Sequence, residues 1–480
     1  MKVRVSNWRF SQKKTTEELL DYFNRFSGLH CSVVRSLEII KEAQDLRKGI
    51  TIVYTVEVDM GEDIDLESLR KKNSKVQINE VKVELIDPTL DFINENSAPK
   101  GNACVIGSGP AGSFAAYALA LSGHKVKVFE RGKKVEDRFK DVKRLFEEGI
   151  FDEKSNICFG EGGAGTFSDG KLTTRKKHPW IRWLLKVMVE CGAPESILTA
   201  SKPHIGSDRL RLVAINFRKK LQAMGVEFHF ETCITDFEVV ENKLVSLKAD
   251  DGRVFEDPGS VVWASGHSAR DSYRLLHEKG LSINKKAFAV GVRIEHPQSL
   301  VNDWIYQNEE LDEAANYSVT CNFTKERSVY SFCMCPGGQV VCSSSHEGYN
   351  VVNGMSNYAR SEDYANAGIV VKVSPDDFKG EDALAGITFQ EKIEKLAFEA
   401  SLGQYAAPAQ LVTDFLDGVK SEALLPSSFK PKLVPAELGE LFPEEITHYL
   451  REALVYFDGR YPGFAGKEAQ LIGVETRTSS

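Results

Sequence analysis

A glycine-rich string between two apolar segments is the first part of the chain whose residue types and spacing suit chemistry. It reads Gly107-Ser108-Gly109-Pro110-Ala111-Gly112, after the apolar segment 103–106 and before the apolar segment 113–121. Gly107 permits a tight turn, Gly109 lets the backbone approach a pyrophosphate, and Gly112 allows close packing of helix on sheet. The amino terminus of that helix offers unpaired N–H groups and a positive dipole end. The string therefore predicts a dinucleotide-binding loop.

A carboxylate stands at the end of the next predicted strand. Glu130 follows the strand Val126–Phe129 and lies eighteen residues beyond Gly112. A carboxylate there can accept hydrogen bonds from a ribose diol and would repel the 2′-phosphate of NADP. These residues leave NAD and FAD as alternatives.

The chain contains the same glycine spacing once more, at Gly160-Glu161-Gly162-Gly163-Ala164-Gly165. This second string lacks an apolar strand before it and an apolar helix after it, so it does not predict a second dinucleotide fold. Without such a second fold, a nicotinamide donor, NAD(P)H, is expected to bind only transiently.

The order of the downstream segments favours FAD over NAD. Glu130-Arg131-Gly132 follows the first string, and a predicted β-meander and the string Trp263-Ala264-Ser265-Gly266 come later. This order resembles the glutathione-reductase-like flavoproteins, where a strand ending in a small-x-Gly turn returns beside the ADP half. The resemblance implies FAD, with Arg131, Cys233, Ser265 and Gly266 among the residues that bind it.

Longer strings narrow the resemblance to one family. They are 159–171, 203–208, 264–271, 290–297, 333–338 and 474–480. Together they are similar to a family of bacterial and plastid FAD-dependent dehydrogenases, over nearly the whole chain. The resemblance implies hydride transfer through flavin N5 to or from an unidentified small-molecule substrate. It also implies that Gly162, Gly163, Gly165, Thr166 and Lys171 run along the flavin side of the cofactor, where glycines admit the ring and N–H groups stabilise its reduced form.

Members of that family carry a late glycine-rich segment with an acidic residue after the string at 474–480. The sequence stops at Ser480. We therefore expect weak or absent FAD retention, and appending the family's segment should raise the flavin occupancy.

Two groups of later residues are candidates for catalysis. Cys333 and Cys335 are two apart, so on a strand they face one side at the limit of disulfide geometry. They are either a redox or nucleophilic pair or two half-buried thiols. Arg293 and His296 lie on or directly after the apolar strand 288–294. Arg293 alternates onto one face with Glu295 and is expected to pair with it or to take part in catalysis, and His296 is a candidate general acid or base.

The elements that must position these residues form three predicted domains. Residues 1–98 follow a β-α-β-β-α-β order, with a helix at Thr16–Phe26, and read as a ferredoxin-like α+β domain. Residues 99–280, returning near 461–480, form an α/β FAD/NAD(P)-binding dinucleotide fold. Residues 281–460 form an inserted mixed α+β substrate domain. The polar linker 94–102, broken by Pro and Gly, separates the first two.

Composition limits the classes of partner. The net charge is -8, which argues against nucleic acid or an anionic membrane as partner. The start of the chain lacks a signal-peptide core, no apolar run approaches the roughly 20 residues of a membrane span, and the nine cysteines do not look like a disulfide framework. We therefore expect a cytoplasmic protein. No cluster has zinc-ligand spacing, so no metal is expected.

Two alternatives of other classes stay open. One is a non-catalytic FAD-binding protein whose amino-terminal domain docks a protein partner of unknown kind. The other is a flavin-dependent RNA-modifying protein, although that domain has no aromatic-rich RNA-binding string.

Overall fold

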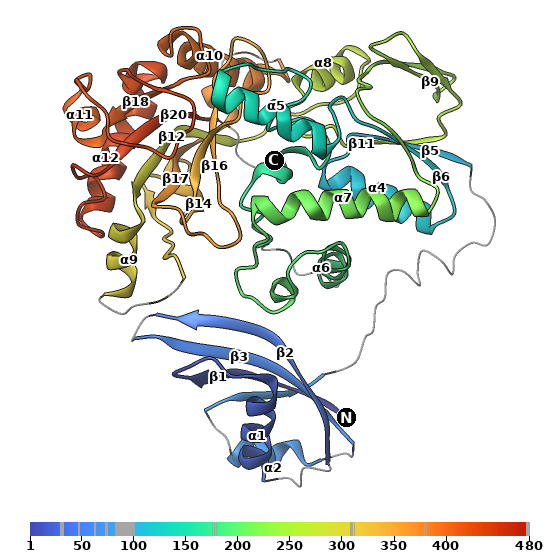
Figure 1. Cartoon of the computed structure of the whole chain (residues 1–480), viewed down its shortest axis with the longest axis vertical. Helices are drawn as coiled ribbons and strands as arrows, with labels where there is room; N and C mark the ends of the chain where they lie inside the picture. The colour runs from blue at the N-terminus through green and yellow to red at the C-terminus, as the bar shows by residue number, and fades with distance from the viewer. Residues whose placement is uncertain are drawn as a thin grey trace. The chain divides into compact units, whose positions relative to one another are not determined.

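The computed structural model describes residues 1–28, 33–46, 49–61, 64–72, 75–81, 101–174, 176, 178, 180–307, 311, 313–378, 380 and 382–476. Two compact units divide the chain. The first combines Met1–Asp91 with Lys171–Ile205, and the second combines Phe92–Gly170 with Gly206–Ser480. The chain therefore passes between the units at three points. Figure 1 shows the helices and strands of both units. Of the predicted linker 94–102, residues 94–100 lie outside the described residues.

The first unit is built on an antiparallel sheet with the strand order β2-β3-β1-β4. Its elements follow the predicted β-α-β-β-α-β succession: β1 (Lys2–Phe10), α1 (Thr16–Ser27), β2 (Val34–Asp45), β3 (Thr51–Met60), α2 (Leu66–Lys72) and β4 (Gln77–Glu80). The sequence predicts the last strand of this order at Val76–Leu85, of which residues 82–85 lie outside the described residues.

Helix α1 shows how sequence sets an element of this unit. A capping box fixes its start, with the Thr15 hydroxyl accepting from the Glu18 N–H at 3.2 Å and Glu18 accepting from the Thr15 N–H at 2.8 Å. Leu19 and Phe23 are four residues apart and therefore share one face, which is fully buried. The helix thus packs its apolar face into the core of the unit.

Residues 171–205 add a further piece to the first unit. They include α6 (Trp180–Glu190) and the short helix η3 (Glu195–Leu198). The Glu42 N–H on β2 donates to Thr199 O at 2.8 Å, and the Ser201 N–H donates to Glu42 O at 2.9 Å. These bonds give the edge strand β2 backbone partners that an edge otherwise lacks.

The second unit contains the predicted dinucleotide fold. A parallel sheet has the order β11-β5-β6-β7, from strands β5 (Asn102–Ile106), β6 (Lys125–Phe129), β7 (Glu227–His229) and β11 (Ser260–Trp263). Helices α4 (Pro110–Leu121), α5 (Val135–Glu148) and α8 (Arg270–Glu278) follow β5, β6 and β11 in sequence, and α7 (Ser207–Ala223) precedes β7.

The predicted meander is wrong in one strand. We predict it from Val226–Phe230, Ile234–Glu241 and Lys243–Ala249, but the first of these is β7 of the parallel sheet. The three-stranded sheet consists of β8 (Ile234–Val240), β9 (Lys243–Ala249) and β10 (Val254–Glu256). Apolar alternation identifies a strand but not the neighbour with which it pairs.

The rest of the second unit is organised around a seven-stranded sheet with the order β13-β14-β17-β12-β20-β18-β19 in the described chain. Its strands are β12 (Phe288–Pro297), β13 (Thr320–Asn322), β14 (Ser328–Cys335), β17 (Tyr364–Val373), β18 (Ala407–Leu411), β19 (Leu433–Pro435) and β20 (Gln470–Glu475). Other elements of the region are β15 (Gln339–Cys342), β16 (Val352–Met355), α9 (Gln298–Tyr306), α10 (Ala385–Ala400), α11 (Val412–Asp417) and α12 (Glu444–Asp458). Strand β20 falls in the stretch 461–480, which we expect to return to the dinucleotide fold, yet it pairs with β12 and β18.

The described part of the chain lacks two kinds of feature. None of its helices is both long enough and apolar enough to span a bilayer. It also holds no group of three or more His, Cys, Asp or Glu side chains arranged to bind a metal ion.

Candidate functional site

A cavity of about 240 Å³ lies where the glycine turn after β5 meets the second glycine string. The predicted cofactor-binding residues that line it are Gly107, Gly109, Pro110, Ala111, Glu130, Arg131, Gly163, Gly165, Cys233, Ser265 and Gly266. Those that do not line it are Gly112, Gly162, Thr166 and Lys171. Most of the predicted cofactor-binding residues thus come together around one space.

The three glycines of the first string have three different steric roles. Gly107 has φ +101°, and a Cβ there would lie 2.4 Å from Ala264 O. A Cβ on Gly112 would lie 1.9 Å from Gly107 O, so this glycine is required for packing α4 on its own turn. A Cβ on Gly109 would meet only Gly163 Cα, at 3.8 Å. The protein itself therefore leaves room at Gly109, at the amino terminus of α4, where an anion is favoured.

The second glycine string lies against the first. The Gly162 N–H donates to Ser108 O at 3.0 Å, and the short helix η2 (Gly163–Phe167) contributes Gly163, Ala164 and Gly165 to the cavity wall. The residues before and after this second string do not indicate that it lines the cavity. Its backbone reaches the cavity by tertiary packing and is not part of a strand–turn–helix. Thr166 has a supporting place, since its hydroxyl donates to Glu161 O at 2.9 Å. Lys171 belongs to the other unit.

Glu130 is buried at the cavity wall and already has four protein donors. Its Oε2 accepts from the Ser108 N–H at 2.9 Å and the Ser108 hydroxyl at 2.8 Å. Its Oε1 accepts from the N–H groups of Gly132 and Gly160, each at 3.0 Å. A carboxylate offers about four acceptor positions, so a ribose would have to displace one of these donors. The ribose contact stays a prediction, and Glu130 has the further role of joining three loops.

The loop after β11 brings further polar groups to the cavity. His267, Ser268 and Ser272 line it beside Ser265 and Gly266. Arg131 lies over the Phe159 ring, with its guanidinium carbon 4.4 Å from the ring centroid, and pairs with Asp271 at 3.0 Å. The cavity therefore has one cation held by stacking and by an ion pair.

Arg138 supports the loop beside the cavity, and the sequence does not reveal this position. This side chain of α5 is fully buried and donates to the carbonyl oxygens of Asn156, Ile157, Gly160 and Glu161 at 2.8, 2.8, 3.3 and 2.6 Å. Burial lowers its pKa to about 10, so the guanidinium stays charged at neutral pH. Charged residues surround Arg138 in the sequence of α5, and an arginine in such a helix is normally predicted to be solvent-exposed. The sequence therefore does not indicate that Arg138 is buried.

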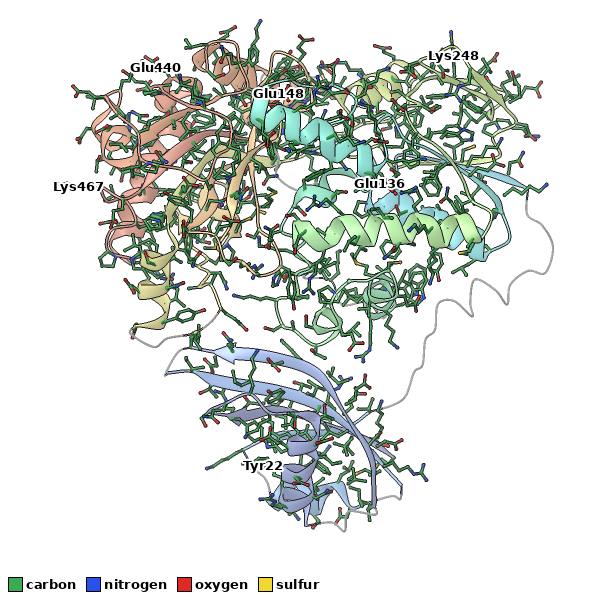
Figure 2. All side chains as sticks on the ribbon, viewed as in Figure 1. Tyr22, Glu136, Glu148, Lys248, Glu440 and Lys467 are labelled. Carbon is green, nitrogen blue, oxygen red and sulfur yellow. The ribbon has the colours of Figure 1, made fainter. Side chains whose placement is uncertain are left out.

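An ion-pair system of two buried side chains, Arg218 and Glu161, and the exposed Glu136 holds the other side of the same loop. Arg218 on α7 donates to Glu161 through Nε and to Glu136 through Nη2, each at 2.7 Å. Glu136, at the start of α5, is labelled in Figure 2. The Val135 N–H also donates to Glu161, at 2.9 Å. The glycine loop between α5 and α7 is thus fixed by charged side chains from both helices.

The predicted catalytic residues do not line the cavity. Arg293 is fully buried, with Nε donating to Asn366 at 3.0 Å, Nη1 to Glu475 at 3.2 Å and Nη2 to Cys333 O at 2.7 Å. The expected pairing of Arg293 with Glu295 is wrong. The carboxylate of Glu295 instead accepts from Ser428 and Gln470.

His296 is enclosed by aromatic rings. Its Nε2 lies 2.8 Å from Phe464 O, and the rings of Phe464 and Trp304 lie 4.9 and 5.1 Å from its own. Burial lowers the pKa of His296 to about 4, so the imidazole is neutral at neutral pH. A role as general acid or base stays a prediction, and these surroundings favour a packing role.

Family models match two parts of the chain. The model described as "FAD-dependent protein, C-terminal domain-like" matches residues 287–478, and that of the NAD(P)-binding Rossmann-like domain matches residues 105–136. An uncharacterized protein of Clostridium beijerinckii is 37% identical over 487 residues, which cover 100% of this chain and 90% of that protein.

Solved structures of flavoproteins resemble the chain more distantly. P. aeruginosa PqsL in complex with 2-aminobenzoylacetate is 15% identical with a TM-score of 0.28, over 58% of this chain and 62% of PqsL. CtdE in complex with FAD is 13% identical with a TM-score of 0.28, over 78% of this chain and 71% of CtdE. A flavoprotein/dehydrogenase from Cytophaga hutchinsonii is 14% identical with a TM-score of 0.27, over 58% of each chain. The chain spans less than two thirds of PqsL and of the Cytophaga protein, and likenesses of this size carry no argument about function.

The predicted family resemblance is confirmed by the two family models and by the relative that matches the whole chain. The chain belongs to the family of FAD-dependent proteins that combine a Rossmann-like NAD(P)-binding domain with an FAD-dependent C-terminal domain.

Proposed function

We propose that the chain is an FAD-dependent oxidoreductase acting on a small-molecule substrate. The observation that carries the proposal is the space left at Gly109, between the amino terminus of α4 and the second glycine string. When bound, FAD supplies two-electron chemistry, with hydride transfer at its N5.

The residues present fit an FAD molecule. The pyrophosphate fits the N–H groups at Gly109 and the positive end of α4. The ADP half fits between Arg131, Cys233 and the turn at Ser265 and Gly266, which line the same cavity. The backbone of Gly163–Phe167 would lie on the flavin side, held there by Arg138 through the preceding loop.

The other parts of the chain have roles that follow from this assignment. The region of the seven-stranded sheet would be the substrate domain. The strand order β2-β3-β1-β4 and the β-α-β-β-α-β succession support a ferredoxin-like assignment for the first unit. The cytoplasmic location, the absence of a nucleic-acid partner and transient NAD(P)H binding stay predictions.

The test begins with the visible spectrum of the purified chain, before and after added FAD. Anaerobic titration with NADH and NADPH follows. A flavin spectrum that either donor bleaches is the expected result, and the more effective donor identifies the nicotinamide.

Two other outcomes have clear meanings. Stable flavin that neither donor reduces, with a co-purifying protein, would favour the non-catalytic alternative. No flavin binding even with FAD in excess would contradict the proposal.

A further inference from the structure

The two cysteines near the end of β14 lie at an irregularity of the sheet. The pairing of β14 with β17 runs regularly to Phe332 and then shifts before Cys335. Cys333 has φ +45°, a conformation that non-glycine residues seldom adopt and that stores strain. The two Sγ atoms lie 4.0 Å apart. A disulfide bond is about 2 Å long, so its formation would bring the two Sγ atoms about 2 Å closer together.

The two thiols differ in their access to solvent. Cys333 is half-buried, whereas Cys335 is fully buried and its Sγ lies 3.3 Å from Cys333 O. In thiol–disulfide exchange the accessible thiol attacks first, and the enclosed one then resolves the mixed disulfide. The pair has the asymmetry that this sequence of steps requires.

A buried cation stands beside the pair. The Arg293 guanidinium, which donates to Cys333 O at 2.7 Å, is fully buried and interacts electrostatically with both thiols. A neighbouring cation favours the thiolate, which is the attacking species. Glu475, at 3.2 Å from Arg293, offsets part of that charge.

We propose that Cys333 and Cys335 form a dithiol–disulfide redox site for low-molecular-weight disulfides. The Cys333 thiolate attacks a disulfide RSSR, which gives a protein–SR mixed disulfide and releases RS⁻. The Cys335 thiolate then attacks the Cys333 sulfur and releases the second RS⁻. The dithiol is oxidised by two electrons and RSSR is reduced to two thiols, while the two cysteine protons end on the released thiolates.

The turn after the pair connects this site with the candidate cofactor site. A Cβ on Gly337 would lie 1.8 Å from Arg360 O, and a Cβ on Gly338 would lie 2.4 Å from the Ser356 hydroxyl. Arg360 pairs with Asp169 at 2.8 Å, two residues after the helix η2 that lines the cavity. The turn after the pair is thus connected, through Arg360 and Asp169, to the loop beside the cavity.

The experiment equilibrates the full chain, with and without FAD, in glutathione buffers of increasing glutathione disulfide content. Alkylation under acid quench and peptide mass spectrometry then measure the thiols. We expect the peptide that holds Cys333 and Cys335 to lose both alkylatable thiols and two hydrogen atoms. In Cys335→Ser we expect a glutathione adduct trapped on Cys333, formed at least about tenfold faster than any adduct on the half-buried Cys321.

Cys321→Ser is the matched control, since it removes a half-buried thiol on β13 and should leave the conversion unchanged. The proposal is overturned if the wild-type peptide keeps both thiols at every buffer ratio. It is also overturned if Cys333 in Cys335→Ser reacts no faster than Cys321. The wild-type measurement needs no variant and no flavin, so it is independent of the proposed oxidoreductase activity.

Discussion

His296 shows how the surroundings of one residue decide its chemistry. The position has the residue type of a general acid or base, and sequence alone supports that role. The structure surrounds the imidazole with Phe464, Trp304 and Tyr317, and lowers its pKa from 6.5 to about 4 by burial. Neutral imidazole is therefore the form that the folded protein favours.

A pH dependence of stability follows from this shift. As pH falls below about 6.5, the unfolded chain binds a proton at His296 before the folded protein does, so the free energy of unfolding decreases. The loss continues to about pH 4 and amounts to about 3 kcal/mol. Denaturant unfolding from pH 7 to 4 should show a shallower decrease in His296→Gln than in the wild type. The exposed His448→Gln is the control, and equal slopes for His296→Gln and wild type would contradict the prediction.

The sequence predicts the residues that line the cavity better than the residues that support them. The fold fixes the spacing of some cavity residues relative to the strands, so the sequence predicts them. These residues are Gly107, Gly109, Arg131 and Gly266. The sequence does not predict Arg138, because its partners are backbone carbonyl oxygens, which every sequence contains. The saturation of Glu130 by Ser108, Gly132 and Gly160 is hidden for the same reason.

At the scale of elements, two glycines at the junction of β5 with α4 differ in role: one is needed for packing the helix, and the other leaves space for the predicted cofactor. Gly112 and Gly109 belong to the same string, yet an added Cβ collides with backbone at 1.9 Å in one case and meets nothing closer than 3.8 Å in the other. The sequence spacing places Gly109 and Gly112 in one motif. In the structure, Gly112 is required for packing and Gly109 leaves space at the cavity.

We expect the two alanine variants to differ accordingly. Gly112→Ala should lower the free energy of unfolding by about 1–3 kcal/mol, because α4 must move from its turn. Gly109→Ala should keep the wild-type stability and lower FAD affinity about tenfold or more, because its methyl group occupies the space for the pyrophosphate. Denaturant unfolding and FAD titration measure the two effects. Ser122→Ala, at the far end of the helix, is the control, and unchanged FAD affinity in Gly109→Ala would refute the assignment of this space.

Strand partners mark the limit of prediction for elements. The alternation of Val226–Phe230 correctly indicates a strand, but its partner is β6, about 100 residues earlier in the chain. The third strand of the antiparallel sheet, Val254–Glu256, is too short for its pattern to identify. Local sequence determines whether a segment forms a strand, and packing against distant parts of the chain determines which strand it pairs with.

On the scale of the whole molecule, each unit has its own core. The core of the first includes Phe23 and the core around the seven-stranded sheet includes Phe457, and both side chains are fully buried. Units with separate cores can unfold separately.

Two core truncations should therefore act on different unfolding steps. Phe23→Ala should destabilise the first unit by about 3–5 kcal/mol and leave FAD affinity unchanged. Phe457→Ala should destabilise the second unit by a similar amount. Calorimetry with a simultaneous flavin readout distinguishes the steps. A single transition shifted equally by both variants would show that the units unfold together.

The division of the first unit between two stretches of sequence also has a consequence for its synthesis. The ribosome delivers residues 1–91 first, but the segment that supplies the partners of β2, at Thr199 and Ser201, emerges only after the turn at Gly107 and helices α4 and α5. Nascent chains fold in the order in which their parts become available. The edge of β2 thus lacks these backbone partners on the nascent chain until the first half of the dinucleotide fold has been made, so the first unit is completed only after part of the second has been synthesised.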